Sequence, residues 1–530
     1  MTATTVGMPY SFPRTSSEVT AHCDGSTFSW NPANDPGVKR LDSLILPGEA
    51  IGTKVSGAMS VGKPVHRASE VEPGTLFFAL VGSQADGHDF AGDALQKGAA
   101  AVVVEKESIF ASLPSAILVR STREAFGLAA SRWYGEPSRH FRLVGVTGTN
   151  GKTTCTFLLR SIWEHLGLTS AVFGTVENRI GNLAEPATLT TPDPSHLQAL
   201  FARSREANVE FAAIEVTSIA LHQSRVAGSH FEVGLFTNLT QDHLDYHGDM
   251  ENYYRAKLRF FQEYGLKAAV INRDDPWGQR LLGESAAERN TSFSLEHRDA
   301  DFSLLEASYD KGLTLARVKT PVGDFLLSTT LIGRHNLYNC LGVLGVTHAL
   351  GLDMKAVVEA LAVAPGAPGR LEKVILGVGK PHVFVDYAHS DDALRNVLRS
   401  LSALKGSGPG VGRIITVFGA GGDRDRGKRP KMASVVSAGS DITVATSDNP
   451  RTEDPERIID DIEGGIDRSL TQYHREVDRR RAIGLALSLA KADDLVLIAG
   501  KGHETYQILG KEKVPFDDRE VIRSYYTESV

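Results

Sequence analysis

FRLVGVTGTNGKTTCTFLLRSIWEHLG, residues 141–167, decides the fold. An apolar run, a glycine-rich turn and a helical pattern follow one another, which is typical of a strand that leads through a phosphate-binding loop into a helix. Small residues let backbone N–H groups close around phosphate oxygens, and the N-terminus of the helix favours negative charge. The stretch therefore predicts nucleotide-phosphate binding by Gly148, Thr149, Asn150, Gly151, Lys152, Thr153 and Thr154.

Within this loop, Lys152 is expected to reach the outer phosphates and the Thr153 hydroxyl to bind Mg²⁺. The usual spacing places a glycine five residues before Gly151, where this chain has Val146, so the loop is a variant P-loop. A fortuitous glycine-rich turn is the alternative interpretation. The strand before the loop and the helix after it favour the phosphate site.

The bulk composition is that of a globular protein with small-molecule partners. The 530 residues suggest about three domains, and a net charge of -7 argues against nucleic-acid binding. Three widely spaced cysteines exclude a disulfide framework and fit a reducing compartment. The N-terminal segment lacks a secretory pattern, and no apolar run approaches the roughly 18 residues that cross a bilayer. We therefore expect a cytoplasmic monomer without membrane or nucleic-acid partners.

Alternating strand and helix patterns predict an α/β fold with doubly wound, mostly parallel sheets. Residues 1–37 are rich in Ser, Thr, Pro, Gly and Asn and are expected to form a loosely ordered tail. Residues 38–120 are predicted to form a first domain, 121–367 a central domain and 368–530 a C-terminal domain, after the breaker cluster PGAPGR.

Two sets of apolar runs support this division. Strands are predicted at 75–82 and 99–106 in the first domain, around a helix at 89–99, and at 211–216, 233–239 and 268–274 in the central domain. In the C-terminal domain, HVFVDYAH, RIITVFGAGG, DITVATSDNP and DLVLIAGKGHE each end in small, polar or charged residues. Such ends line up along one edge of a parallel sheet, where ligands bind.

One of these ends, Asp448-Asn449-Pro450-Arg451, could be no more than a turn, because Asp and Asn bond their own backbone and Pro fixes φ. The three matching ends argue instead for a ligand site.

Several long segments resemble the Mur ligases, amide-forming enzymes of peptidoglycan assembly. GVTGTNGKTT (145–154) is similar to their ATP loop. The resemblance is to the branch that adds the third amino acid of the stem peptide, and it spans roughly residues 60–525. It rests on TNLTQDHLDYHGDMENYYRAK, VFGAGGDRDRGKRP, SDNPRTEDP and GKGHETYQ.

The resemblance implies a UDP-substrate-binding N-terminal α/β domain, a central P-loop ATPase-like domain and a Rossmann-like C-terminal domain. It also implies an ATP-dependent acid–amino-acid ligase. Such an enzyme adds meso-2,6-diaminopimelate to UDP-MurNAc-L-Ala-D-Glu through an acyl phosphate and releases ADP and phosphate.

The implied catalytic residues are Lys152, Glu215, His243 and Lys257. The resemblance makes Thr153, Glu215, His243 and Lys257 the Mg²⁺ ligands, with Lys257 as a carbamate formed from CO₂. Taken alone, Glu215 could be an edge carboxylate, His243 a structural histidine and Lys257 a solvated helix lysine.

The resemblance also assigns the ligand contacts. Adenosine-side contacts are Asn272, Arg334 and Asn336, in addition to the loop. The UDP-MurNAc-dipeptide would meet Ser69, Thr190, Thr191, Thr217, Ser218, Gln223 and Arg225. The chain departs from the family pattern at Ile219, where a histidine is usual, at Arg67-Ala68-Ser69 and at Ser390-Asp391.

For the amino acid, Arg451 offers a guanidinium fork to the distal carboxylate that distinguishes diaminopimelate from lysine. A pocket built for that carboxylate penalises lysine, because Arg451 is then left unpaired. The resemblance completes the pocket with Arg424, Asp448, Asn449, Gly500 and Glu504.

Other functions stay open on the sequence. A ligase of the same family could add lysine or another diamino acid, or use another acceptor, as other Mur ligases and folate polyglutamate ligases do. A non-catalytic ATP-binding regulator is an alternative of a different class.

Overall fold

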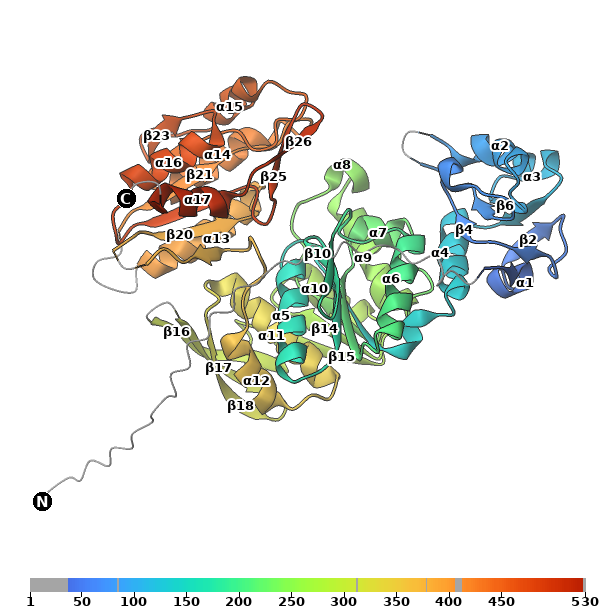
Figure 1. Cartoon of the computed structure of the whole chain (residues 1–530). Helices are drawn as coiled ribbons and strands as arrows, with labels where there is room; N and C mark the ends of the chain where they lie inside the picture. The colour runs from blue at the N-terminus through green and yellow to red at the C-terminus, as the bar shows by residue number, and fades with distance from the viewer. Residues whose placement is uncertain (1–36, 83–84, 311–312, 378, 406–411, 528–530) are drawn as a thin grey trace, which may run out of the picture.

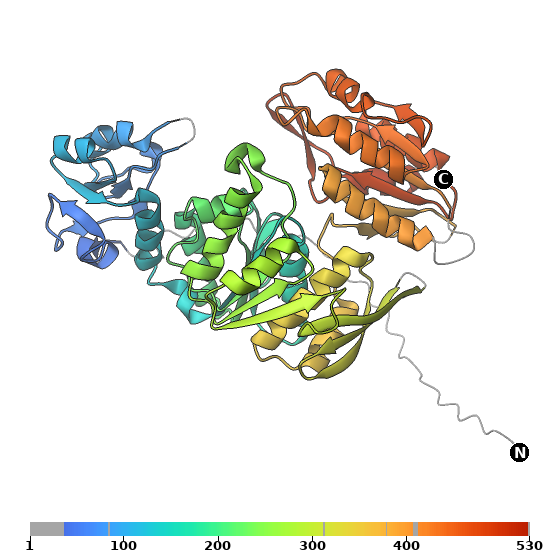
Figure 2. The same ribbon diagram turned by 180° about the vertical axis from the view of Figure 1, so that it is seen from behind.

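The computed structural model describes residues 37–82, 85–310, 313–377, 379–405 and 412–527. Three α/β domains lie in a row, with the central one in the middle (Figures 1 and 2). The tail predicted for residues 1–37 lies outside the described residues except for Gly37. No helix in the described ranges combines the length and the apolar character that a membrane span requires.

The N-terminal domain is built on a five-stranded sheet of order β2-β7-β6-β5-β4. β4 to β7 are parallel and β2 is antiparallel. The strand expected over 75–82 pairs in the sheet only as β5, because the chain then turns and Val81 bridges to Asp86. The strands are β2 (Ala50–Thr53), β4 (Pro64–Val65), β5 (Leu76–Phe78), β6 (Ala101–Val104) and β7 (Ala116–Val119). The smaller elements are β1 (Lys39–Arg40), β3 (Ser60–Val61), α1 (Leu41–Leu44), α2 (Ala91–Gln96) and α3 (Glu107–Ser112).

Helix α4 (Thr122–Trp133) joins the first two domains. Ser121 caps it by accepting from the Glu124 N–H. Its buried side chains, including Phe126 and Trp133, share one core with the N-terminal sheet and with α6 of the central domain.

The central domain holds an eleven-stranded sheet of order β11-β10-β9-β12-β8-β13-β14-β15-β16-β17-β18. The strands from β9 to β16 in this order are parallel, and antiparallel hairpins extend both edges. The strands are β8 (Arg142–Thr147), β9 (Ser170–Phe173), β10 (Glu177–Ile180), β11 (Leu183–Pro186), β12 (Phe211–Glu215), β13 (Val233–Phe236), β14 (Ala268–Asn272), β15 (Arg289–Ser294), β16 (Phe302–Asp310), β17 (Leu313–Thr320) and β18 (Gly323–Thr329).

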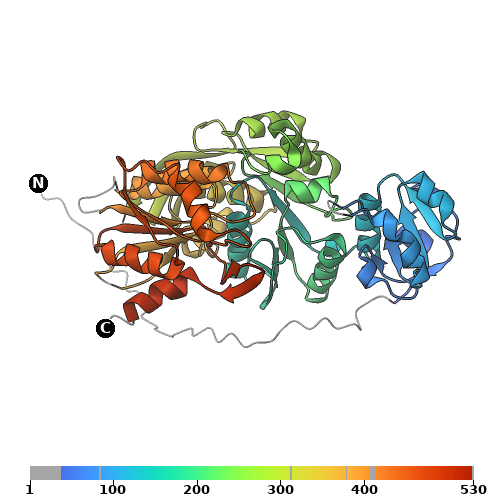
Figure 3. The same cartoon turned by 90° about the horizontal axis from the view of Figure 1, so that it is seen from above.

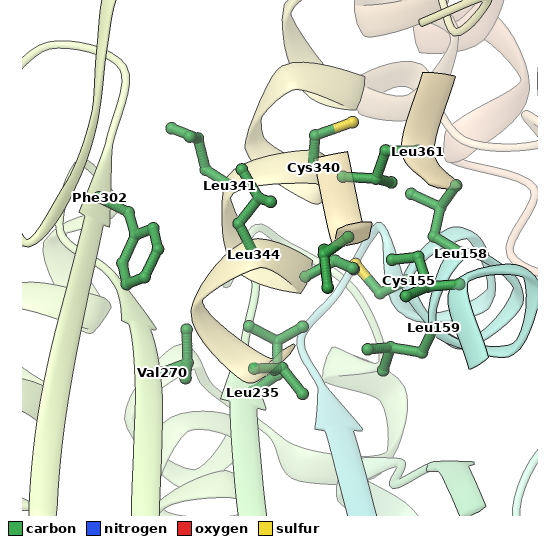
Figure 4. Packing of buried hydrophobic residues seen from close by; sticks show 14 of the residues in the cluster. Cys155, Leu158, Leu159, Leu235, Val270, Phe302, Cys340, Leu341, Leu344 and Leu361 are labelled. Atoms are coloured by element: carbon green, nitrogen blue, oxygen red, sulfur yellow. The ribbon is translucent and has the colours of Figure 1, made fainter. Parts of the chain in front are cut away.

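Helices cover both faces of this sheet, so its central strands are apolar throughout. One core packs α5, α11 and α12 on the sheet, and Figure 4 shows its leucines and two cysteines. The other core packs α6, α9 and α10 on the opposite face. The helices are α5 (Lys152–His165), α6 (Pro194–Glu206), α7 (Ser218–His222), α8 (Leu244–His247), α9 (Met250–Glu263), α10 (Pro276–Glu284), α11 (Arg334–Ala349) and α12 (Met354–Val363).

The C-terminal domain has a six-stranded sheet of order β19-β20-β24-β21-β22-β23, parallel except for β19. Figure 3 shows it at the far end of the molecule from the N-terminal domain. The strands are β19 (Glu372–Val374), β20 (His382–Asp386), β21 (Ile414–Phe418), β22 (Ile442–Ala445), β23 (Gln472–Arg475) and β24 (Leu495–Ala499), and β25 (Tyr506–Leu509) and β26 (Glu512–Pro515) form a separate hairpin. The helices are α13 (Asp391–Lys405), α14 (Lys428–Gly439), α15 (Pro455–Glu463), α16 (Arg479–Leu489) and α17 (Asp518–Thr527). The predicted three-domain α/β architecture is confirmed.

Candidate active site

The glycine-rich loop joins β8 to α5, and its glycines are required by shape. Gly148 has φ +146°, and a Cβ there would lie 1.9 Å from Thr237 Oγ1. Gly151 has φ +88°, and a Cβ there would lie 2.5 Å from Asn339 Oδ1. The loop therefore packs against the end of β13 and against α11, and only glycine fits at these two positions.

Two lysine ammonium groups meet at this loop. Lys152 Nζ donates to the carbonyls of Gly148 at 2.9 Å and Thr149 at 2.8 Å. Lys257 Nζ, from α9, donates to the same Gly148 carbonyl at 3.1 Å and to Thr147 Oγ1 at 3.2 Å. Lys257 is only 1% exposed. Burial, reinforced by the Lys152 charge, holds the pKa of the Lys257 amine well below its usual range.

A buried hydroxyl–carboxylate pair lies beside the loop. Thr153 Oγ1 donates to Glu215 Oε2 at 3.1 Å, and Glu215 ends β12. Thr175 fixes the same carboxylate through its N–H at 2.8 Å and its hydroxyl at 3.1 Å. Gly174 leaves room for it, since a Cβ there would lie 2.3 Å from Glu215 Oε1.

These oxygen donors fit Mg²⁺, which takes one or two protein oxygens and completes its shell with water and phosphate. Three or more His, Cys, Asp or Glu side chains do not gather into a metal-binding group anywhere in the described ranges. Thr153 and Glu215 lie together as predicted. The side chain of His243 is 46% exposed and lies 3.6 Å from Asp242, and no contact joins it to Glu215 within the described residues.

A cavity opens between the central and C-terminal domains next to the loop. Of the adenosine-side residues predicted, Asn336 lines it, but Asn272 and Arg334 do not. Asn272 is buried and donates to the Thr237 carbonyl at 2.8 Å, and Arg334 pairs with Glu296 at 2.8 Å. The other lining residues are Asn150, Gly151, Thr154, Thr237, Asn238, Phe293, His335, Tyr338, Asn339, Arg370, Asp386, Ala388, Ala393, Asn396 and Val397.

Arg370 is a site residue that the sequence reasoning missed. Its guanidinium donates to Thr153 Oγ1 at 3.3 Å and lies over the Tyr387 ring, with 4.7 Å to the centroid. Neighbouring Asp386 accepts from the N–H groups of Leu371 and Ala388. Arg370 is the last residue of the PGAPGR cluster and Asp386 ends an apolar run, but neither position by itself marks a contact with the phosphate loop.

Four of the residues predicted for the UDP-linked acceptor form a polar cluster next to the Glu215 carbonyl, namely Thr191, Thr217, Gln223 and Arg225. Thr191 Oγ1 donates to the Glu215 carbonyl at 2.8 Å and lies 3.1 Å from Thr217 Oγ1. Arg225 donates to the Thr191 carbonyl at 3.1 Å and to Gln223 Oε1 at 2.8 Å.

The remaining residues predicted for the acceptor are Thr190, Ser218 and Ser69. Thr190 Oγ1 lies 3.2 Å from Thr175 Oγ1. Ser218 Oγ lies 2.9 Å from His247 Nε2, so an imidazole adjoins this segment although residue 219 is isoleucine. Ser69 is exposed on the N-terminal domain and does not contact the cluster within the described part of the chain. Arg67, two residues earlier, lies 3.9 Å from Asp193.

The six residues predicted for the amino acid do come together in the C-terminal domain. Asp448 and Asn449 are only 6% and 5% exposed, so the segment after β22 is not a solvated turn. Asn449 Nδ2 donates to Glu504 Oε2 at 2.9 Å, and a Cβ at Gly500 would lie 3.4 Å from Asp448 Oδ2. Burial raises the pKa of Asp448.

Arg451 and Arg424 both lie beside Gly421 in the same region. A Cβ there would lie 3.0 Å from Arg451 Nη1 and 3.7 Å from Arg424 Cγ. Arg451 itself has φ +52° and donates to the Gly422 carbonyl at 2.7 Å. Carboxylates and guanidiniums side by side complement the ammonium and carboxylate groups of an amino acid.

A P-loop beside a buried carboxylate, a cavity between the central and C-terminal domains, and a cluster of carboxylate, amide and guanidinium groups in the C-terminal domain are together typical of a nucleotide-dependent α/β ligase. Family models match in the same order along the chain. They are the Mur ligase family catalytic domain over 66–134, the Mur ligase middle domain over 146–347 and the Mur ligase glutamate ligase domain over 369–502.

The chain is also similar to whole relatives. A UDP-N-acetylmuramoyl-L-alanyl-D-glutamate–2,6-diaminopimelate ligase from Trichormus variabilis is 44% identical over 86% of this chain and 92% of its own. The enzyme of the same name from Geobacter sulfurreducens is 44% identical over 91% and 97%. A solved structure of that name has a TM-score of 0.69 at 33% identity and covers 93% of this chain and 99% of its own. The chain belongs to the Mur ligase family.

Proposed function

We propose that this protein is the ATP-dependent ligase that adds meso-2,6-diaminopimelate to UDP-MurNAc-L-Ala-D-Glu in the cytoplasm, a step of peptidoglycan synthesis. The observation that carries the proposal is the C-terminal pocket. Arg424 and Arg451 lie beside Gly421, and Asn449, two residues before Arg451, donates to the Glu504 carboxylate. Asp448 in the same segment is buried. The relatives that share 44% identity over most of the chain carry the name of this activity.

The chemistry begins between two anions, and the loop supplies positive charge to bring them together. The substrate carboxylate attacks the γ-phosphate of ATP, and Lys152 with the N-terminus of α5 stabilises the phosphate oxygens. Arg370 contacts Thr153 and so lies where a terminal phosphate would be held. The diaminopimelate amine then attacks the acyl phosphate, and the products are an amide and phosphate.

Mg²⁺ held by Thr153 and Glu215 would screen the charges of ATP and of the substrate carboxylate. Lys257 would fit a carbamate role, since burial lowers the pKa of its amine and so favours the neutral form that reacts with CO₂. His243 would be a further ligand of the second metal site.

The proposal is tested by phosphate release with ATP, Mg²⁺ and UDP-MurNAc-L-Ala-D-Glu, with meso-diaminopimelate or L-lysine added in parallel. Turnover with diaminopimelate alone is expected. Arg451→Ala should raise the KM for diaminopimelate by about 10- to 100-fold with a smaller effect on kcat, since it removes hydrogen bonds to a charged group. Turnover with lysine would contradict the substrate, and wild-type kinetics in Arg451→Ala would contradict the pocket.

A further inference from the structure

Lys501 is a fully buried lysine inside the amino-acid pocket, with an exposure of 0%. Its ammonium donates to Glu504 Oε2 at 2.9 Å and to Asn449 Oδ1 at 3.3 Å, and lies 3.8 Å from Asp448 Oδ1. Two of the three N–H donors of the Lys501 ammonium are therefore engaged by Glu504 and Asn449, and Asp448 Oδ1 lies within ion-pair distance without a hydrogen bond.

The contacts of Lys501 set the orientation of its neighbours. Asn449 Oδ1 accepts from Lys501 and from the Ile508 N–H at 2.9 Å, which turns Asn449 Nδ2 toward Glu504. Glu504 Oε2 therefore receives two hydrogen bonds. Within the described residues, Glu504 Oε1 and Asp448 Oδ1 have no hydrogen-bond partner.

The cation of Lys501 also bears on the charge of these carboxylates. Burial raises the pKa of Asp448, while the nearby charges of Arg479 and Lys501 act to lower it. Without a cation at position 501, the buried carboxylate of Asp448 and the partly buried carboxylate of Glu504 would lose a shared ionic partner. Glu504 would also lose a hydrogen bond that holds it in the pocket and would be free to turn away.

We propose that Lys501 is a positioning residue of this pocket, which fixes Glu504 and Asn449 through its hydrogen bonds and leaves one oxygen each of Glu504 and Asp448 free to accept from the ammonium group of a diamino acid. This inference rests on the proposed function. It assigns the two ends of the pocket to different chemistry, with the carboxylates for the amine and Arg451 for the carboxylate.

The backbone around Arg451 is held independently of Lys501. The Arg451 N–H donates to the Ile508 carbonyl at 3.1 Å, and the Gly510 N–H donates to the Arg451 carbonyl at 2.8 Å. Gln507 Nε2 donates to the Asp448 carbonyl at 2.6 Å. Loss of Lys501 should therefore disturb the carboxylate end and leave the guanidinium end in place.

Lys501→Met is expected to raise the KM for meso-diaminopimelate at least about tenfold, with unchanged KM for ATP and a much smaller change in kcat. The matched control is Lys513→Met. Lys513 is an exposed lysine of strand β26, and its ammonium lies 4.2 Å from the centroid of the Tyr506 ring. The Lys501 ammonium lies 5.7 Å from the centroid of the same ring. The control Lys513→Met should behave as wild type. Lys501→Gln, which keeps an N–H donor, serves as the second variant and should shift the KM in the same direction.

A double-mutant cycle separates positioning from general damage. Lys501→Met combined with Glu504→Gln should cost less than the sum of the single changes, because both act on one carboxylate. When Lys501→Met is combined with Arg451→Ala, the effects of the two single changes on the KM for diaminopimelate, expressed as free energies, should add. An unchanged KM for diaminopimelate in whichever Lys501 variant folds, or equal losses toward ATP and diaminopimelate, would overturn the inference while the proposed function stands. An inactive wild-type protein would overturn both.

Discussion

At the scale of single residues, Lys257 is a group whose burial lowers the stability of the fold while its proposed role is in turnover. Its amine is 1% exposed and bonds only to neutral oxygens of Thr147 and Gly148 in the described part of the chain. Lys257→Met should abolish turnover and yet raise the apparent midpoint of thermal unfolding, since at least about 1 kcal/mol of desolvation cost is removed. Differential scanning fluorimetry measures the midpoint of thermal unfolding, and the phosphate-release assay measures turnover.

The pH dependence of this effect has a defined sign. The folded-state pKa of Lys257 is lowered, so the unfolded chain binds more protons between that pKa and the ordinary lysine pKa of about 10.4, and the wild type gains stability as pH rises over this range. In buffer free of bicarbonate, the gap between Lys257→Met and wild type should shrink over that range. If the difference in stability between Lys257→Met and wild type is independent of pH, the buried amine of Lys257 is not the source of that difference.

At the scale of elements, the loop between β8 and α5 depends on contacts from distant strands and helices. Gly148→Ala should abolish ATP binding and destabilise the central domain by about 1–3 kcal/mol, because its Cβ would lie 1.9 Å from Thr237 Oγ1. Calorimetric titration with a non-hydrolysable ATP analogue measures the first effect. The control is Gly283→Ala in α10, where no atom lies within 4 Å of the added Cβ. Wild-type nucleotide affinity in Gly148→Ala would contradict this account of the loop.

The same elements show what the sequence could predict. The strand, loop and helix at 142–165 are specified by local periodicity and glycine spacing, so they were predictable. Arg370 was not, because it reaches Thr153 across a domain boundary, and such a contact depends on domain orientation, which leaves no local pattern. Asn272 and Arg334 were placed at the adenosine by resemblance, yet their side chains are engaged with Thr237 and Glu296.

At the scale of the whole molecule, the central and C-terminal domains meet through polar contacts, and the cavity beside the phosphate loop, the proposed nucleotide site, lies between them. Inter-domain surfaces of this polar kind permit relative motion. Lys428 Nζ lies 3.4 Å from Asp242, next to His243, and His335 Nδ1 lies 3.1 Å from Ser400 Oγ. The positions of the proposed metal site and the amino-acid pocket relative to each other therefore depend on a few side-chain contacts.

Asp392 connects α13 to the phosphate loop through hydrogen bonds. Its Oδ2 accepts from Asn150 Nδ2 at 3.2 Å and from Thr240 Oγ1 at 3.1 Å. Hydrogen bonds to a charged group contribute about 1.5–3 kcal/mol, so Asp392→Ala should shift the population toward arrangements with the domains further apart. Small-angle X-ray scattering of the ligand-free protein should then show a larger radius of gyration. Asp391→Ala is the matched control, since this neighbour on α13 pairs weakly with Arg395 at 3.9 Å. Its scattering should equal that of wild type, and identical scattering from Asp392→Ala would mean that other contacts set the domain arrangement.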